Sequence, residues 1–133
     1  MRTRWKPLSD WTILKTIDAH SAGEPLRIIT EGLSPIPGRS IIEKRRYAQE
    51  HLDHLRTALM WEPRGHADMY GCIITEPVSP DSHMGALFLH NAGFSTMCGH
   101  GIIALTTVAL ETGLVRVRGK RPILKIDTPA GQI

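Results

Sequence analysis

Cysteine, aromatic residues and long apolar runs are all scarce in this chain of 133 residues, which has two cysteines and 5% aromatic residues. Two cysteines without C-x-x-C spacing exclude a disulfide framework and a structural zinc site. No stretch approaches the roughly 18 apolar residues of a membrane helix, and the start lacks the apolar segment of a secretory signal. We therefore expect a cytoplasmic protein with no membrane partner.

Charge of either sign is also modest. The formal net charge is +3, and the basic clusters at residues 1–6, 44–46 and 116–121 are separated along the chain. A nucleic-acid groove would need a continuous basic surface interleaved with aromatic side chains. The composition, with 41% hydrophobic and 22% charged residues, instead predicts one globular domain over residues 1–133 and no nucleic-acid partner.

Alternating or β-branched runs separated by turn residues predict several strands. We expect a hairpin from residues 11–20 and 21–30, a loop over 31–40, an antiparallel pair from 68–77 and 84–93, and a last strand and turn within 123–131. Together with two helical segments, these strands predict an α/β fold of the α+β type, built on a mixed sheet.

The clearest helix is predicted from Ser40 to about Trp61. Ser40 and Glu43 have the spacing of a capping box, and Pro63 disfavours helix in the residue before it. An apolar stripe is expected from Ala48, Leu52, Leu55 and Leu59. The residues expected to face solvent are Lys44, Arg45, Glu50 and Asp53.

A second helix is predicted from Cys98 to Leu110, within "NAGFSTMCGHGIIAL", and ends near Gly113. It is apolar almost all round, which predicts a central buried helix. The first-turn amides, from Gly99 to Gly101, lack partners within the helix, and their dipoles favour a thiolate and a bound carboxylate.

These parts suit removal of the α-proton of an amino acid, with Cys98 as the base and His100 as a further donor. The arrangement requires no cofactor and no metal. A packed, inert Cys98 explains the same residues, because free cysteine is often buried. On the residues alone both interpretations stay open, whereas Cys72, within an apolar strand, is interpreted as structural.

Other polar residues in turns beside glycine are weaker candidates. His20 and Glu24 lie in "DAHSAGEP", and His66 and Asp68 lie in "PRGHADMYG", with no role assigned to them. His51 and His54 are one turn apart around Asp53, but no third metal ligand accompanies them, so they are interpreted as surface residues.

The segments "IDAHSAGEPLRII", "EKRRYAQEHLDHLRTALMWEPRGHADMYG" and "GFSTMCGHGIIAL" closely resemble the N-terminal half of the proline racemase family. The resemblance runs from about Thr12 to Gln132 and includes proline racemases, hydroxyproline epimerases and trans-3-hydroxy-L-proline dehydratases. It implies one half of a diaminopimelate-epimerase-like fold, with the active site in a cleft between two similar halves.

The resemblance also implies residue roles: Cys98 accepts a proton from the substrate ring, and Gly99 and His100 bind the substrate. The run "LFLHNAGFSTMCGH" looks most like the dehydratases, which convert trans-3-hydroxy-L-proline to pyrroline-2-carboxylate. A proline racemase or 4-hydroxyproline 2-epimerase is the alternative, and a noncatalytic carboxylate-binding half is another.

Members of the family are more than twice as long, so residues 1–133 correspond to their N-terminal half. We expect this half alone to turn over poorly, because the second catalytic residue lies outside it. We also expect an exposed apolar surface that favours self-association, and a two-fold homodimer would bring two Cys98 residues to one cleft.

Overall fold

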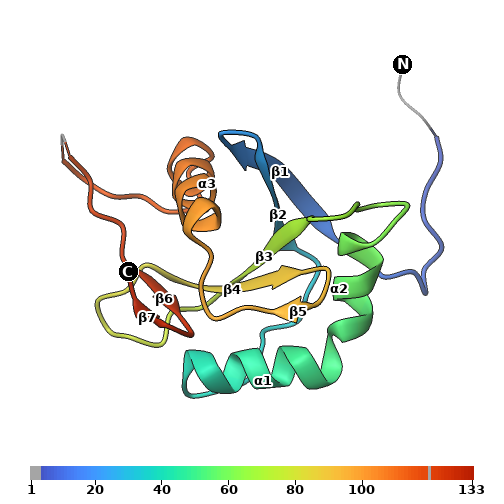
Figure 1. Ribbon diagram of the computed structural model, residues 1–133, viewed down its shortest axis with the longest axis horizontal. Helices are drawn as coiled ribbons and strands as arrows, with labels where there is room; N and C mark the ends of the chain where they lie inside the picture. The colour runs from blue at the N-terminus through green and yellow to red at the C-terminus, as the bar shows by residue number, and fades with distance from the viewer. Residues whose placement is uncertain (1–3, 120) are drawn as a thin grey trace.

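The computed structural model describes residues 4–119 and 121–133, so parts of the basic runs at 1–6 and 116–121 lie outside the described residues. Within the described part, a seven-stranded mixed sheet has the strand order β1-β2-β3-β4-β6-β7, with β5 paired to β4. Helix α3 lies on one face of the sheet and α1 lies on the other, with α2 following it (Figure 1). The strands are β1 (Lys15–Ser21), β2 (Glu24–Glu31), β3 (Tyr70–Thr75), β4 (Met84–His90), β5 (Gly93–Phe94), β6 (Ile126–Thr128) and β7 (Gly131–Gln132). The helices are α1 (Ile41–His51), α2 (Asp53–Met60) and α3 (Gly99–Glu111).

Both predicted strand pairs form. β1 and β2 make an antiparallel hairpin whose turn residues, Ala22 and Gly23, have φ of 51° and 95°. Positive φ at both turn positions matches the natural twist of a hairpin. β3 and β4 are antiparallel neighbours, whereas β2 and β3 run parallel because the two helices connect them. The two-residue strand β5, which folds back on β4, was not predicted.

The period-two alternation of the strands divides the core between the two faces of the sheet. Leu26, Cys72 and Phe88 face α3, while Ile73 and Leu87 face the other two helices. β4 is therefore buried on both faces, which explains its nearly continuous apolar sequence.

The predicted single helix over residues 40–61 is wrong in one respect, because it is broken at Leu52. Leu52 has φ of −117° and ψ of 8° and ends α1 while it precedes α2. The apolar spacing continues across the break, so the sequence did not reveal it. The predicted capping box forms in part: Ser40 Oγ accepts from the Glu43 amide at 3.2 Å, but Glu43 Oε2 accepts from the amide of Arg39, at 2.7 Å, and not from that of Ser40.

Lys44 was predicted to face solvent, and this is also wrong. The inward face of α1 is formed by Ile41, Lys44 and Ala48, so Lys44 is only 7% exposed. Its stem packs against the loop before α1, and its ammonium donates to the carbonyl oxygen of Ile36 at 3.3 Å. Long lysine stems commonly cover apolar surface in this way.

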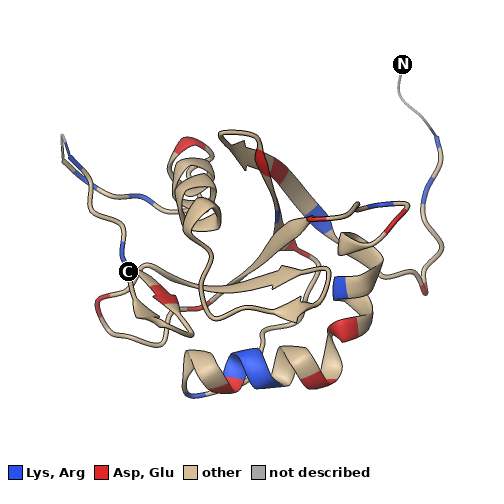
Figure 2. Cartoon of the chain, in the orientation of Figure 1, with Lys and Arg blue, Asp and Glu red and all other residues tan. Residues whose placement is uncertain are grey.

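Helix α3 begins and ends where the sequence predicts. Cys98 is its N-cap residue, and Gly113, with φ of 73°, follows its C-cap. The prediction that this helix is buried all round is wrong, because its burial is one-sided: Ala104, Leu105, Val108 and Ala109 pack on the sheet, whereas Ile103 is 60% exposed. None of the helices in the described residues has the length and apolar character needed to cross a membrane. The described charges are distributed over the helices, the strands β1, β2 and β6, and the connecting loops (Figure 2).

Candidate active site

The predicted site is centred on the N-terminus of α3. Cys98 has extended backbone angles, φ −143° and ψ 108°, and its side chain makes no capping hydrogen bond to the helix. The backbone amides at the start of a helix have no partner within that helix. The three predicted site residues, Cys98, Gly99 and His100, therefore lie together where a helix can receive an anion.

The glycines on either side of His100 differ in their surroundings. A Cβ atom on Gly101 would lie 2.9 Å from Phe88 Cε1 and 3.0 Å from Cys98 Sγ, so packing requires glycine there. A Cβ on Gly99 would meet no other residue within 4 Å, apart from its chain neighbours Cys98 and His100 and the adjoining helix backbone. The space next to Cys98 is therefore open on the Gly99 side and filled on the Gly101 side.

The protonation of Cys98 differs from the sequence-based expectation of a favoured thiolate. Burial raises the pKa of the Cys98 thiol; the Gly101 amide lowers the pKa, and the Glu24 carboxylate raises it further. The net direction is upward, because the side chain is only 6% exposed and the helix start offsets only part of its desolvation. The expectation considered the helix start and left out burial.

His100 links Cys98 to the aromatic side chains of the sheet. Both ring nitrogens of His100 lie 3.6 Å from Cys98 Sγ, so the sulfur is in contact with the imidazole ring. The same ring meets Tyr70 edge-on, with centroids 4.7 Å apart, and Tyr70 in turn lies 5.8 Å from the ring of His90. These rings form a row that leads from Cys98 across the ends of β3 and β4.

Sequence reasoning missed Tyr70 and His90. They are register partners on the antiparallel strands β3 and β4, so pairing these strands in sequence would have placed them side by side. The Nδ1 atom of His90 accepts from the Ala92 amide at 3.2 Å, which leaves Nε2 as the donor in the neutral ring.

The four turn residues without an assigned role separate into two groups. Glu24, at the end of the β1–β2 hairpin, lies close enough to act electrostatically on Cys98. His20 belongs to the same hairpin, and its Nδ1 accepts from the Gly23 amide at 3.2 Å. His66 and Asp68 lie in the loop between α2 and β3, and neither forms a hydrogen bond to the Cys98 group in the described residues.

That loop is fixed by Asn91, another residue that sequence reasoning missed. Asn91 Oδ1 accepts from the Met69 amide at 3.1 Å, and Nδ2 donates to the carbonyl oxygens of Met60 and His66, both at 2.9 Å. Its own carbonyl oxygen accepts from Trp61 Nε1 at 2.9 Å. Asn91 therefore holds the end of α2 and the loop before Tyr70 against the end of β4.

The remaining candidates occupy places that suit structural roles. Cys72 is fully buried in the core, and burial raises the pKa of its thiol strongly. His51 stacks on Tyr47 with ring centroids 4.3 Å apart, and His54 is exposed on α2. Two cavities, of about 430 and 690 Å³, lie elsewhere, and Cys98 lines neither of them.

Comparison with known proteins decides the family, since a proline racemase family model matches residues 16–133. The chain belongs to the proline racemase family. The trans-3-hydroxy-L-proline dehydratase of Bacillus thuringiensis subsp. konkukian is 59% identical over 121 residues, which is 91% of this chain and 36% of that protein. The 3-hydroxyproline 2-epimerase of Burkholderia multivorans is 50% identical over 120 residues, with coverage of 90% and 36%.

A solved structure supports the same assignment. The probable proline racemase of Agrobacterium radiobacter K84, solved with bound carbonate, superposes with a TM-score of 0.82 at 25% identity, over 90% of this chain and 36% of that one. The mixed α/β fold of this family was thus predicted correctly. The chain spans about a third of the length of the curated relatives that it matches.

Proposed function

We propose that this chain supplies the Cys98 half of a site that removes the α-proton of a cyclic imino acid. The observation that carries the proposal is the start of α3: the Cys98 sulfur and the first-turn amides meet at one point, with open space at Gly99. A base and a carboxylate-binding group are the two parts that this proton transfer needs on one face of the substrate.

In this proposal, the amides of Gly99 and His100 hold the substrate carboxylate, and Cys98 Sγ accepts the proton from the α-carbon. When the α-proton leaves, part of the negative charge that develops on the substrate moves to its carboxylate. The amide donors hold this carboxylate and therefore stabilise that charge. A raised thiol pKa makes the thiolate less abundant near neutral pH, but it also makes that thiolate a stronger base.

We propose trans-3-hydroxy-L-proline as the substrate. Loss of the α-proton to Cys98 and departure of the 3-hydroxyl as water give an enamine, which tautomerises to pyrroline-2-carboxylate. The support is the name of the 59% identical relative, a trans-3-hydroxy-L-proline dehydratase. Departure of the hydroxyl needs a proton donor, which we assign to the part of the family's site that lies outside this chain.

Epimerisation of a hydroxyproline is the second candidate, since a 50% identical relative is named a 3-hydroxyproline 2-epimerase. Both reactions begin with the same proton transfer, so the Cys98 half serves either one. The residue on the opposite face of the substrate distinguishes them. Carboxylate binding without catalysis is the third candidate, and it retains the amides of Gly99 and His100 without a role for the sulfur.

The test is a chimera in which this chain replaces the matching segment of the Bacillus thuringiensis dehydratase. The chimera is expected to form pyrroline-2-carboxylate from trans-3-hydroxy-L-proline, and Cys98→Ser is expected to lower kcat about 100-fold or more because the base is lost. Exchange of the α-hydrogen in deuterium oxide, followed by NMR, reports the proton transfer separately from the dehydration.

Cys72→Ala in the same chimera is the matched control, because it removes a thiol that is buried in the core. It is expected to keep most of the activity. Retained exchange and turnover in Cys98→Ser would contradict the assignment of the base. Because the opposite face of the site comes from the Bacillus dehydratase, the chimera tests the Cys98 half, which both candidate reactions share, and not the choice between dehydration and epimerisation.

A further inference from the structure

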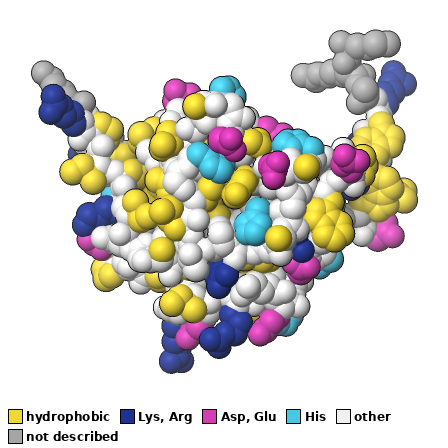
Figure 3. Space-filling model, in the orientation of Figure 1, with side chains coloured by type: hydrophobic (Ala, Val, Ile, Leu, Met, Phe, Trp, Pro, Cys, Tyr) yellow, Lys and Arg dark blue, Asp and Glu magenta, His cyan; other side chains and the backbone are white. Residues whose placement is uncertain are grey.

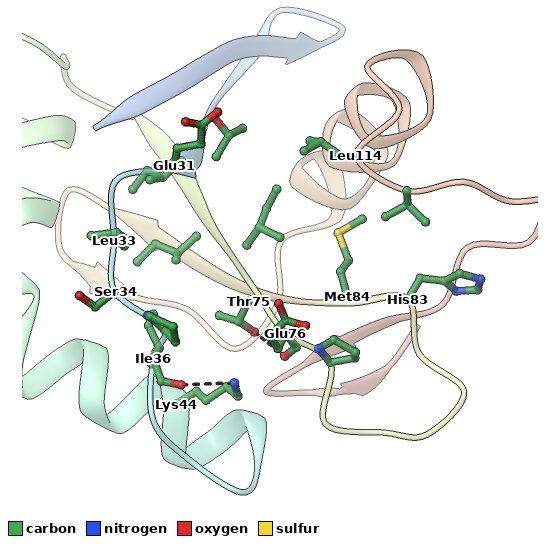
Figure 4. A pocket seen from close by; sticks show the side chains of 17 residues that line it. Glu31, Leu33, Ser34, Ile36, Lys44, Thr75, Glu76, His83, Met84 and Leu114 are labelled. Atoms are coloured by element: carbon green, nitrogen blue, oxygen red, sulfur yellow. Dashed lines mark hydrogen bonds between the residues drawn. The ribbon is translucent and has the colours of Figure 1, made fainter. Parts of the chain in front are cut away.

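The 430 Å³ cavity lies at the end of the fold opposite to Cys98. It is lined by the last residues of β2 and β3, the first residue of β4, and Leu114 and Val115, which follow the C-terminus of α3 (Figure 4). Its volume is within the range of about 300 to 1,000 Å³ that is usual for small-molecule sites. Since Cys98 lies at the other end of α3, this cavity is separate from the proposed active site.

One wall of the cavity carries a buried ammonium group. Lys44 is 7% exposed, and its Nζ has one hydrogen-bond partner among the described residues, the carbonyl oxygen of Ile36 at 3.3 Å. None of the ion pairs in the described residues includes Lys44. A lysine ammonium has three N–H donors, and burial of a charge without partners is costly. Lys44 therefore has unused donors and unbalanced charge in the cavity.

An exposed carboxylate lies on the same cavity. Glu76 follows β3 and is exposed, and it too belongs to none of the ion pairs in the described part of the chain. Glu31, the other acidic residue of the lining, is already paired with Lys15 at 2.6 Å. Figure 4 shows Lys44 extending from α1 toward the end of β3, where Thr75 and Glu76 lie.

The rest of the lining is mixed: Thr30, Ser34, Thr75 and His83 are polar, and Ile29 and Ile73 form an apolar part. The cavity thus offers one unpaired positive group, one unpaired negative group and an apolar wall. A simple carboxylate would leave Glu76 as a repelling charge, and a simple amine would be repelled by Lys44. A zwitterion satisfies both groups at once.

We propose that this cavity binds a small free amino acid with an apolar side chain. Its carboxylate accepts from the Lys44 ammonium, its ammonium group donates to Glu76, and its side chain lies against Ile29 and Ile73, which face α1 as Lys44 does. This site does not depend on the function proposed for Cys98.

The test is a titration of the isotope-labelled chain with L-leucine, followed by backbone amide NMR. Saturable shifts are expected at Ile36, Thr75, Glu76 and Leu114, with Gly99 and His100 unchanged. Two analogues each lack one charged group of leucine: 4-methylpentanoate has no ammonium, and 3-methylbutylamine has no carboxylate. Each is expected to bind at least about tenfold more weakly, because one charged hydrogen bond is lost.

Variants separate the two contacts. Lys44→Met keeps the length of the buried stem and is expected to weaken L-leucine binding about tenfold or more. Glu76→Gln, at an exposed position where folding is not at risk, is expected to weaken L-leucine binding and to improve that of 4-methylpentanoate. Arg46→Met, on the exposed side of the same helix, is the control and is expected to bind like the unaltered chain.

The inference is overturned if L-leucine causes no saturable shifts at the cavity, or shifts only Gly99 and His100. It is also overturned if the analogues bind as well as L-leucine, or if Glu76→Gln leaves the preference between L-leucine and 4-methylpentanoate unchanged. The last comparison decides the matter even if Lys44→Met fails to fold.

Discussion

At the scale of single residues, Cys98 shows two opposing influences on one thiol. The helix start provides the Gly101 amide, which lowers the pKa, while burial and the Glu24 carboxylate raise it. The spacing of a sequence motif reveals the first influence but not the second, because desolvation depends on how distant strands pack around the sulfur. Predicting the position of Cys98 was therefore easier than predicting its protonation.

Glu24→Gln is expected to lower the pKa of Cys98, because it removes a negative charge that disfavours the thiolate. The rate of iodoacetamide labelling of Cys98, measured by mass spectrometry against pH, should then rise at a lower pH than in the unaltered chain. Glu31→Gln, at the other end of β2, is the control and should leave the profile in place. An identical profile for Glu24→Gln and the unaltered chain would contradict the electrostatic role of Glu24.

Asp127 is a buried carboxylate on β6, only 2% exposed. It accepts hydrogen bonds from the amides of Val78 and Ser79 at 2.7 and 2.9 Å and from the Ser82 hydroxyl at 2.8 Å. Burial raises the pKa of this carboxyl, but the hydrogen bonds from Ser79, Val78 and Ser82 lower it by more, so the net direction is downward. The ionised form thus stabilises the folded chain, and it ties the loop between β3 and β4 to the sheet.

Asp127→Asn is expected to lower the free energy of unfolding by about 1 to 3 kcal/mol at pH 7. Since the folded-state pKa is lowered, the contribution is present above the unfolded-state pKa and is lost as the pH falls through the folded-state pKa. Urea unfolding at a series of pH values should show the difference from the unaltered chain shrinking below about pH 4. Asp10→Asn, at an exposed position, should unfold like the unaltered chain at every pH.

At the scale of elements, local signals in the sequence predicted most of the secondary structure. The turn at Ala22 and Gly23, the cap at Ser40 and the glycine after α3 are short-range features, and each marked a boundary correctly. The break at Leu52 and the burial of Lys44 depend on how α1 and α2 pack against the sheet and the loop before α1. They are therefore long-range features. The pairing of Tyr70 with His90 is long-range as well, which explains why the site was predicted only around α3.

Helix α3 offers a matched pair of glycine substitutions. Gly101→Ala would bring a methyl group within 2.9 Å of the fully buried Phe88 and 3.0 Å of Cys98 Sγ, whereas Gly99→Ala would meet no atom within 4 Å beyond its chain neighbours and the adjoining helix backbone. Overpacking is expected to outweigh the gain in helix propensity, so Gly101→Ala should lower the free energy of unfolding by about 1 to 2 kcal/mol. Gly99→Ala should change it by less than about 1 kcal/mol.

The same pair separates stability from access to the sulfur. Gly99→Ala fills the open space beside Cys98, so it is expected to slow iodoacetamide labelling at a fixed pH while denaturant unfolding stays nearly unchanged. If Gly99→Ala unfolds as easily as Gly101→Ala, the space at Gly99 is not open as described. If it labels at the unaltered rate, that space is not the route to the sulfur.

At the scale of the whole molecule, α3 is covered on one side only. The helix is apolar almost all round, yet Ile103 is 60% exposed, and Met97 and Leu114, just outside its two ends, are 44% and 46% exposed. Figure 3 shows hydrophobic side chains at the surface in this region. Apolar groups gathered on a surface favour association. This arrangement agrees with the sequence-based expectation of self-association, which stays a prediction.

Ile103→Lys tests this prediction, because it places a charge in the centre of the uncovered side of α3. If two copies bury this face, the substitution is expected to weaken dimerisation about tenfold or more, since it removes the burial of one large apolar side chain. Sedimentation velocity over a concentration series measures the effect. Ile42→Lys on α1, at a side chain that is 54% exposed on the other face of the sheet, is the matched control and should leave the dimerisation constant unchanged. A chain that stays monomeric at the highest concentration, or that loses association equally in both variants, would show that this side of α3 does not mediate self-association.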